Sequence, residues 1–222
     1  MIAAATERCL SFVDMMSLEQ RYRAAFVNSL TGFKSVCLIG TVDQNKQTNL
    51  AIFNSLIHIG ANPPYIGFIS RPDSVDRHTL DNIMQTGFYT INQINENIYM
   101  QAHQTAARYP KDVSEFEATG LTEEYKDDFK APFVKESIIK MGVRFQERIH
   151  IKTNNTIIVV GQIEKVYFPN NCLCSDGFVD IEKAGTITCA GLDSYHKTQR
   201  LERLAYAKPN KIPEACQLKY IE

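Results

Sequence analysis

Two long runs rich in apolar and β-branched residues flank one short polar turn, and this pattern limits the fold more than any other feature of the chain. The runs cover residues 138–151 and 156–167, and the turn between them is Lys152-Thr153-Asn154-Asn155. Asn and Thr favour a tight reversal between strands, so the segment predicts a β-hairpin. The first expectation is therefore a fold built on antiparallel strands.

Several shorter segments complete the pattern. Strand-like composition recurs at residues 35–42, 51–59, 65–70, 88–94 and 186–191. Residues 76–87 and 95–108 instead have the spacing of amphipathic helices, and the charged segment 109–133 is expected to be a surface excursion or a lid. Because this order is not β-α-β-α, we expect a mainly β fold, a Greek-key-like antiparallel β-barrel with peripheral helices.

The charge balance and the cysteines exclude some classes of partner. The chain has 24 basic and 25 acidic side chains, which gives no bulk attraction to nucleic acid or to an anionic membrane. No stretch approaches the roughly 20 apolar residues of a membrane span. The six cysteines are scattered and form no dense disulfide framework, so we expect free thiols in a reducing compartment and a cytoplasmic protein.

Motifs of the common nucleotide, nucleophile and metal sites do not occur in the sequence. There is no G-x-G-x-x-G, no G-x-x-x-x-G-K-[ST], no G-x-S-x-G and no H-E-x-x-H. Cys172-x-Cys174 is a single pair without a second Cys or His pair, so no metal site is expected. Dinucleotide-binding Rossmann, P-loop and zincin chemistry therefore lose their usual support in the sequence.

Four segments carry a more specific signal when they are taken in order. They are residues 48–55 (TNLAIFNS), 63–72 (PPYIGFISRP), 77–83 (RHTLDNI) and 86–92 (TGFYTIN). Together they resemble the flavin reductase-like, FMN-binding split-barrel family, to which flavoredoxins also belong. The commonest form of the family has Pro where this chain has Ile52, and Lys-Asp where it has Arg77-His78.

The resemblance continues more loosely through residues 102–106, 115–121 and 190–196. It therefore implies one FMN-binding split-barrel domain over residues 17–209, preceded by an N-terminal extension, 1–16, and followed by a C-terminal tail, 210–222. The role of the extension is left open, as is that of the Cys172 and Cys174 pair.

The residue types in the matched segments suit the chemistry of FMN. Arg71 and Arg77 can bind a phosphate dianion through charge-assisted hydrogen bonds, and the start of a helix near Thr79 adds free N–H groups. Strand 51–59 can offer backbone amides and polar side chains to the flavin ring, with Ala51, Phe53 and Ser55 on one face and Asn54 on the other. The cofactor-binding residues implied by the resemblance are Asn49, Leu50, Ala51, Phe53, Asn54, Ser55, Ser70, Arg71, Pro72, Arg77, His78, Thr79, His103 and Tyr195.

A reductase is the function that the resemblance implies. NADH or NADPH would reduce FMN in an open groove bordered by His103 and segment 109–133, in a homodimer with the flavin near the interface and an oxygenase or another molecule as acceptor. Tyr195 or His196 is a hypothetical ring-stacking or proton-supplying residue. Two alternatives stay open: an FMN-binding electron carrier that does not oxidise nicotinamide, and an OB-type nucleic-acid binder, which the neutral charge and the lack of Trp disfavour.

Overall fold

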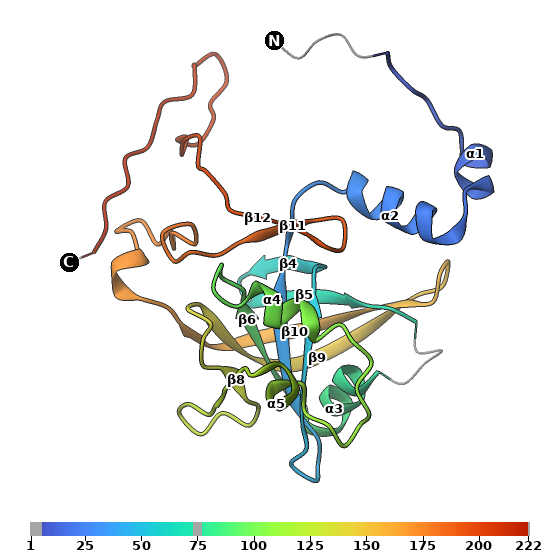
Figure 1. The fold of residues 1–222 in the computed structure, drawn as a ribbon. Helices are drawn as coiled ribbons and strands as arrows, with labels where there is room; N and C mark the ends of the chain where they lie inside the picture. Colours follow the sequence, from blue (N-terminus) through green and yellow to red (C-terminus); the bar gives the residue numbers. More distant parts are fainter. Residues whose placement is uncertain (1–5, 73–76, 222) are drawn as a thin grey trace.

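Seven antiparallel strands form the main sheet, which curls into a barrel (Figure 1). The structure, a computed structural model, describes residues 6–72 and 77–221. The strands follow the order β3 (Thr48–Phe53), β2 (Cys37–Val42), β6 (Phe88–Gln93), β9 (Lys140–Ile151), β10 (Thr156–Tyr167), β5 (Pro64–Ser70) and β4 (Leu56–Ala61). Strands β3 and β4 are consecutive in sequence but lie at opposite ends of this order, so the barrel is split between them. The mainly β fold and the hairpin of β9 and β10 are confirmed.

Shorter elements surround the barrel. Strands β1 (Lys34–Ser35), β11 (Thr188–Ala190) and β12 (Ser194–His196) form a small sheet, and β7 (Glu123–Glu124) pairs with β8 (Phe133–Val134). The helices are α1 (Phe12–Ser17), α2 (Gln20–Leu30), α3 (His78–Thr86), α4 (Tyr99–Gln104), α5 (Glu115–Thr119) and the 3-10 turn η1 (Asn170–Cys172). Helix α3 ends at Gly87 in the left-handed conformation, as its sequence predicts. Asp76, at the predicted start of this helix, lies outside the described residues.

The two largest hydrophobic cores pack against the main sheet. The barrel interior holds Phe68, Tyr89, Ile91, Val143 and Val159, all fully buried. Gly161 faces this interior, where a Cβ atom would collide with the Tyr89 hydroxyl and a Val143 methyl group. A glycine at this place in β10 therefore lets the strand curve closely around the packed rings.

The second core lies between β2, β3 and the helices α4 and α5, and it corrects one expectation. Segment 109–133 is not simply a charged surface excursion, because Phe116, Leu121 and Phe133 within it are buried. The segment contains a helix, α5, whose apolar side chains pack against β3. The many charged residues of the segment predicted its exposed surface correctly but gave no indication of this buried helix.

The predicted strand 51–59 is also wrong in one respect, since it is two strands. β3 ends at Phe53 and β4 begins at Leu56. Between them, the Ser55 hydroxyl donates to the carbonyl of Ile69 at 3.0 Å and accepts from its N–H at 3.1 Å. This side chain takes the place of a strand neighbour for Ile69, so the chain can turn away from β2 and cross to β5.

Three other expectations need adjustment at their boundaries. The predicted helix 95–108 is limited to α4, and the predicted strand 186–191 to β11. The predicted N-terminal extension, residues 1–16, holds most of α1, and α2 lies at the start of the predicted domain. The division into domains at residues 16 and 209 stays a prediction. No helix in the described part of the chain is long and apolar enough to cross a membrane.

Several hydrogen bonds attach the C-terminal segment to the body, and one buried carboxylate accepts two of them. Asp180 accepts hydrogen bonds from Arg200, from the Tyr220 hydroxyl at 2.7 Å and from the Lys183 N–H at 3.1 Å. Burial favours the neutral acid, but these donors outweigh it and lower the pKa of Asp180 from 3.8 to about 2. The charged form therefore holds the segment in place.

Asp180→Asn should accordingly change the acid stability of the protein. A lowered pKa contributes stability that is present above pH 3.8 and is lost as the pH falls through about 2. We expect wild type to be more stable than the variant at neutral pH and the difference to shrink between about pH 4 and pH 2. Urea unfolding at several pH values measures this, and a difference that does not depend on pH would contradict it.

Candidate functional site

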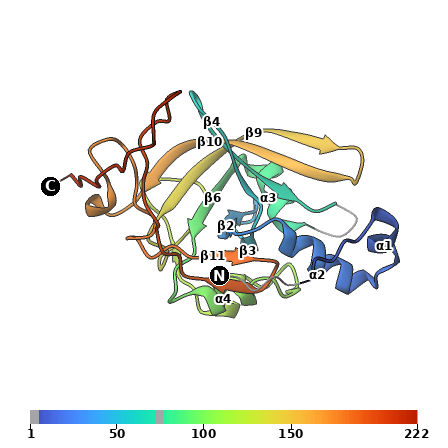
Figure 2. The ribbon, with the colours of Figure 1, turned by 90° about the horizontal axis from the view of Figure 1, so that it is seen from above.

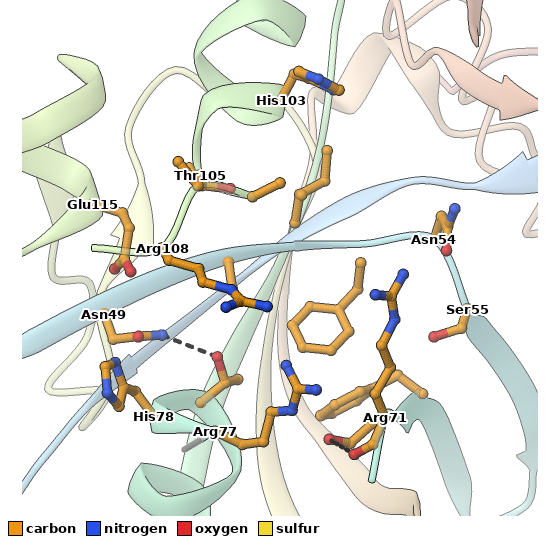
Figure 3. A pocket seen from close by; sticks show the side chains of 18 of the residues that line it. Asn49, Asn54, Ser55, Arg71, Arg77, His78, His103, Thr105, Arg108 and Glu115 are labelled. Atoms are coloured by element: carbon orange, nitrogen blue, oxygen red, sulfur yellow. Dashed lines mark hydrogen bonds between the residues drawn. The ribbon is translucent and has the colours of Figure 1, made fainter. Parts of the chain in front are cut away.

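A cavity of about 1040 Å³ opens at the split of the barrel. It lies between β3, β5, the start of α3, the loop after α4 and the segment around β11 and β12 (Figure 3). Of the residues proposed to bind the cofactor, all but Leu50 and Pro72 line this cavity. The fold thus brings together side chains from positions 49 to 195.

The start of α3 is fixed to β3 by one buried hydrogen bond. Asn49 on β3 donates from Nδ2 to Oγ1 of Thr79 at 3.0 Å (Figure 3), and both side chains are buried. Because the Thr79 oxygen accepts this bond, its own hydrogen is directed elsewhere, and Thr79 lines the cavity. Thr79 is therefore an oriented donor for a ligand, and Asn49 is the residue that orients it.

Three arginines from separate segments point into the same space. Arg71 follows β5, Arg77 is the N-cap residue of α3 and Arg108 lies in the loop after α4 (Figure 3). None of them takes part in an ion pair among the described residues. Like charges that line one cavity repel one another, and an anion bound between them removes this repulsion.

The N-terminus of α3 adds to this positive region. Among the described residues no side chain caps the helix, and Arg77 donates from Nε to the carbonyl of Pro72 at 3.3 Å, which holds its guanidinium beside the helix start. Free N–H groups and the positive end of the helix dipole favour an anion here. Pro72 thus acts on the site through its carbonyl, although its ring does not line the cavity.

At the split itself, two predicted ligands already have backbone partners. Asn54 donates from Nδ2 to the carbonyl of Gly191 at 3.0 Å, and Ser55 is held by Ile69 as described above. Phe53 packs edge-on against Phe68 with 4.9 Å between the ring centroids. These contacts give the cavity a rigid, partly aromatic wall.

Tyr195 lines the cavity, whereas His196 does not. The Tyr195 hydroxyl is 2.8 Å from Nδ1 of His103, and burial, helped by the neighbouring Cys189 and Asp193, raises its pKa to about 12. His196 instead pairs with Ser194 at 2.8 Å and packs against Phe33. The histidine beside Tyr195 is thus His103, which is far from it in sequence.

Leu50 packs in the protein core and does not line the cavity. Its side chain is fully buried in the second core, and its N–H donates to Oε2 of Glu115 at 2.9 Å. Burial raises the pKa of Glu115, which lines the cavity. Leu50 therefore offers a ligand neither its side chain nor its N–H.

Sequence reasoning missed a second group of lining residues. They come from β3, the loop between α4 and α5 and the first residue of α5, and they are Ile52, Thr105, Ala106, Ala107, Arg108, Tyr109, Pro110, Lys111 and Glu115. The signals for this group were the resemblance over residues 48–55, 102–106 and 115–121 and the expectation that segment 109–133 would border a groove. Arg108 was predicted to be the last residue of the helix 95–108, whereas it lies in the loop after α4.

The split barrel and the basic, aromatic cavity at its opening together define a protein of the split β-barrel class. Residues 32–177 match the family model described as the flavin reductase like domain. This chain belongs to that family.

Solved structures agree with this assignment. A protein of Shewanella frigidimarina NCIMB 400, described as a flavin reductase with split barrel domain, is 53% identical, with a TM-score of 0.87 over 90% of this chain and 100% of that one. Nitrilotriacetate monooxygenase component B from Bacillus cereus is 18% identical, with a TM-score of 0.78 over 89% and 100% of the two chains. Flavoredoxin of Desulfovibrio vulgaris (Miyazaki F) is 21% identical, with a TM-score of 0.67 over 79% and 92%. The last two show a common fold.

Proposed function

We propose that this protein is an FMN-binding oxidoreductase that uses NADH or NADPH to reduce its flavin. The observation that carries the proposal is that Arg71, Arg77 and Arg108 line one cavity together with the start of α3, where Thr79 presents a hydroxyl. A phosphate monoester is a dianion at neutral pH, and three guanidinium groups with a helix N-terminus form a strong site for it.

The rest of the cavity suits the flavin ring of FMN. Its volume of about 1040 Å³ is just above the range of roughly 300–1,000 Å³ that is typical of small-molecule sites, so a ligand as large as FMN can enter it. Phe53 and Ile52, with the buried Phe68 packed behind Phe53, supply an apolar wall of the kind a flat tricyclic ring needs. FMN has both parts, a phosphate and a flat ring, joined by a flexible chain.

When bound, FMN would accept a hydride from the nicotinamide and pass electrons to an acceptor. The protein's part is to bind and orient: the arginines and Thr79 hold the phosphate, and the wall of β3 positions the ring. The hydrogen bonds of Asn49 to Thr79 and of Glu115 to Leu50 fix α3 and α5 to β3 beside the ligand. Such chemistry requires no nucleophile or general base, in agreement with the lack of a triad in the sequence.

The experiment that tests the proposal has two parts. The purified protein should take up FMN, with the visible spectrum of a bound flavin, and NADH or NADPH should bleach that spectrum under anaerobic conditions. Failure to bind FMN would overturn the proposal. Binding without bleaching would leave an electron carrier of the flavoredoxin kind. We also expect a homodimer with the flavin near the interface, and an oxygenase or another electron acceptor as partner.

Tyr195→Phe tests whether the pair with His103 serves nicotinamide oxidation. The variant loses a neutral hydrogen bond, which contributes about 0.5–1.5 kcal/mol, so we expect kcat/KM for NADH to fall by up to about tenfold. The affinity for FMN should stay nearly the same. His196→Ala is the matched control because His196 lies outside the cavity, and an equal loss in both variants would exclude a specific role for the pair.

A further inference from the structure

The N-terminal arm, defined as residues 12–33, stands apart from the barrel. It contains α1, α2 and the link to β1, and Figures 1 and 2 both show its helices at one side of the body. No residue of either helix is buried. Yet both helices are properly capped: Ser11 and Asp14 form a capping box on α1, and Glu19 accepts from two N–H groups of α2. The arm has defined structure but no core of its own.

The arm exposes an unusual amount of apolar surface. Seven large apolar side chains on it are between 46 and 73% exposed, namely Phe12, Val13, Met16, Tyr22, Val27, Leu30 and Phe33. Helices of 6 and 11 residues are marginal in water unless an apolar face packs against something. A surface of this kind indicates a contact with another molecule.

A hollow on the outside of the barrel has matching chemistry. It has a volume of about 420 Å³ and is lined mainly by Ile57, Ile59, Tyr65, Ile149, Ile158 and Val160, on strands β4, β5, β9 and β10. None of these residues lines the cavity described above. Ile59 and Ile149 are 43 and 45% exposed, so the arm of the same chain leaves the hollow open.

We propose that the N-terminal arm of one protomer binds in the hollow of a second copy of this chain. Each copy carries one arm and one hollow, so a twofold exchange covers two arms and two hollows at once and leaves no open end. The exposed part of seven such side chains is on the order of 700 Å² per arm, taking roughly 160 Å² for each, near the lower end of the area that an aromatic side chain buries. Two arms then lose about 1,400 Å², and the surfaces that they cover lose a similar area, so the exchange buries roughly 2,800 Å² in all, within the 2,000–5,000 Å² typical of obligate homodimers.

The inference rests on the homodimer expected above and assigns the segments that form it. Sedimentation of the full chain tests it first. Wild type should sediment as a dimer, about twice the 25.2 kDa of the chain. Val27→Glu in the arm and Ile149→Glu in the hollow should each weaken the dimer by at least about 100-fold, because each places a charge in an apolar contact. Both positions are exposed within one chain, so neither variant should disturb folding.

Val166→Glu is the matched control. Val166 is also an exposed apolar residue of β10, 47% exposed, but it lies outside the hollow. This variant should remain a dimer. If the Val27→Glu and Ile149→Glu variants also remain dimers, the arm does not form the interface, although the homodimer and the FMN site would still stand. The visible spectrum with FMN checks the cofactor site independently in every variant.

Cross-linking distinguishes exchange between copies from folding back within one copy. In a chain with Cys9→Ser and Cys216→Ser, the remaining native cysteines are buried. Val27→Cys and Ile149→Cys then supply the two reactive thiols for a short bismaleimide. The expected product is a covalent dimer, with residues 27 and 149 joined in its peptide map. A 27–149 link confined to the monomer band, or a monomeric wild type, overturns the proposal.

Discussion

Replacing Arg71 and Arg77 together by alanine should weaken FMN binding by about 10²–10⁴-fold, because each charge-assisted hydrogen bond contributes roughly 1.5–3 kcal/mol and each 1.4 kcal/mol is a factor of ten. Riboflavin, which has the ring but no phosphate, should bind the variant and wild type almost equally. Fluorescence titration with both ligands measures the two affinities.

The control for this prediction is Arg144→Ala. Arg144 is an exposed arginine of β9 that pairs with Glu164 at 2.7 Å, away from the cavity. It should leave the affinity for FMN unchanged. If riboflavin and FMN lose affinity equally in the double variant, the arginines support the cavity wall and do not bind phosphate, and the proposed orientation of the ligand is wrong.

Phe116→Ala should be among the most destabilising single changes in the chain, at about 3–5 kcal/mol. Phe116 is 1% exposed and joins α5 to the core below β3. A loss of this size lowers Tm by roughly 6–20 °C in a protein of this length. Calorimetry and urea unfolding of the apo protein measure it.

Tyr125→Ala provides the comparison within the same segment. Tyr125 is 55% exposed, and its removal should change the stability by no more than about 0.5 kcal/mol. If residues 109–133 formed a lid that opens freely, Phe116→Ala would also cost little. A loss below about 1 kcal/mol for Phe116→Ala would therefore contradict the structural role of α5.

The sequence predicted well wherever local periodicity decides the structure. The β9–β10 hairpin and the helix ending at Gly87 follow from alternation, turn residues and a C-cap glycine. The main side of the cavity could also be predicted, since residues 49 to 79 lie in one stretch of chain with a recognisable order of motifs. Their roles as ligands stay predictions.

The features that could not be predicted depend on contacts between residues that are far apart in the sequence. Ser55 breaks the predicted strand only because Ile69, fourteen positions later, needs its hydroxyl. The charged composition of segment 109–133 concealed α5, whose burial depends on β3 being nearby. His103 and Tyr195 meet through tertiary folding alone, and adjacency in sequence favoured His196 instead.

The split between β3 and β4 has a consequence for how a ring can be recognised. Leu50 directs its N–H out of the ladder to Glu115, and alternate residues of a strand point to the same edge. Ile52, two positions along and at the cavity, therefore turns its N–H and C=O toward the open edge of the barrel. A flat ligand that carries a hydrogen-bond donor beside an acceptor on one edge can bind to these two backbone groups. It then makes the hydrogen bonds that a neighbouring strand would make at this open edge.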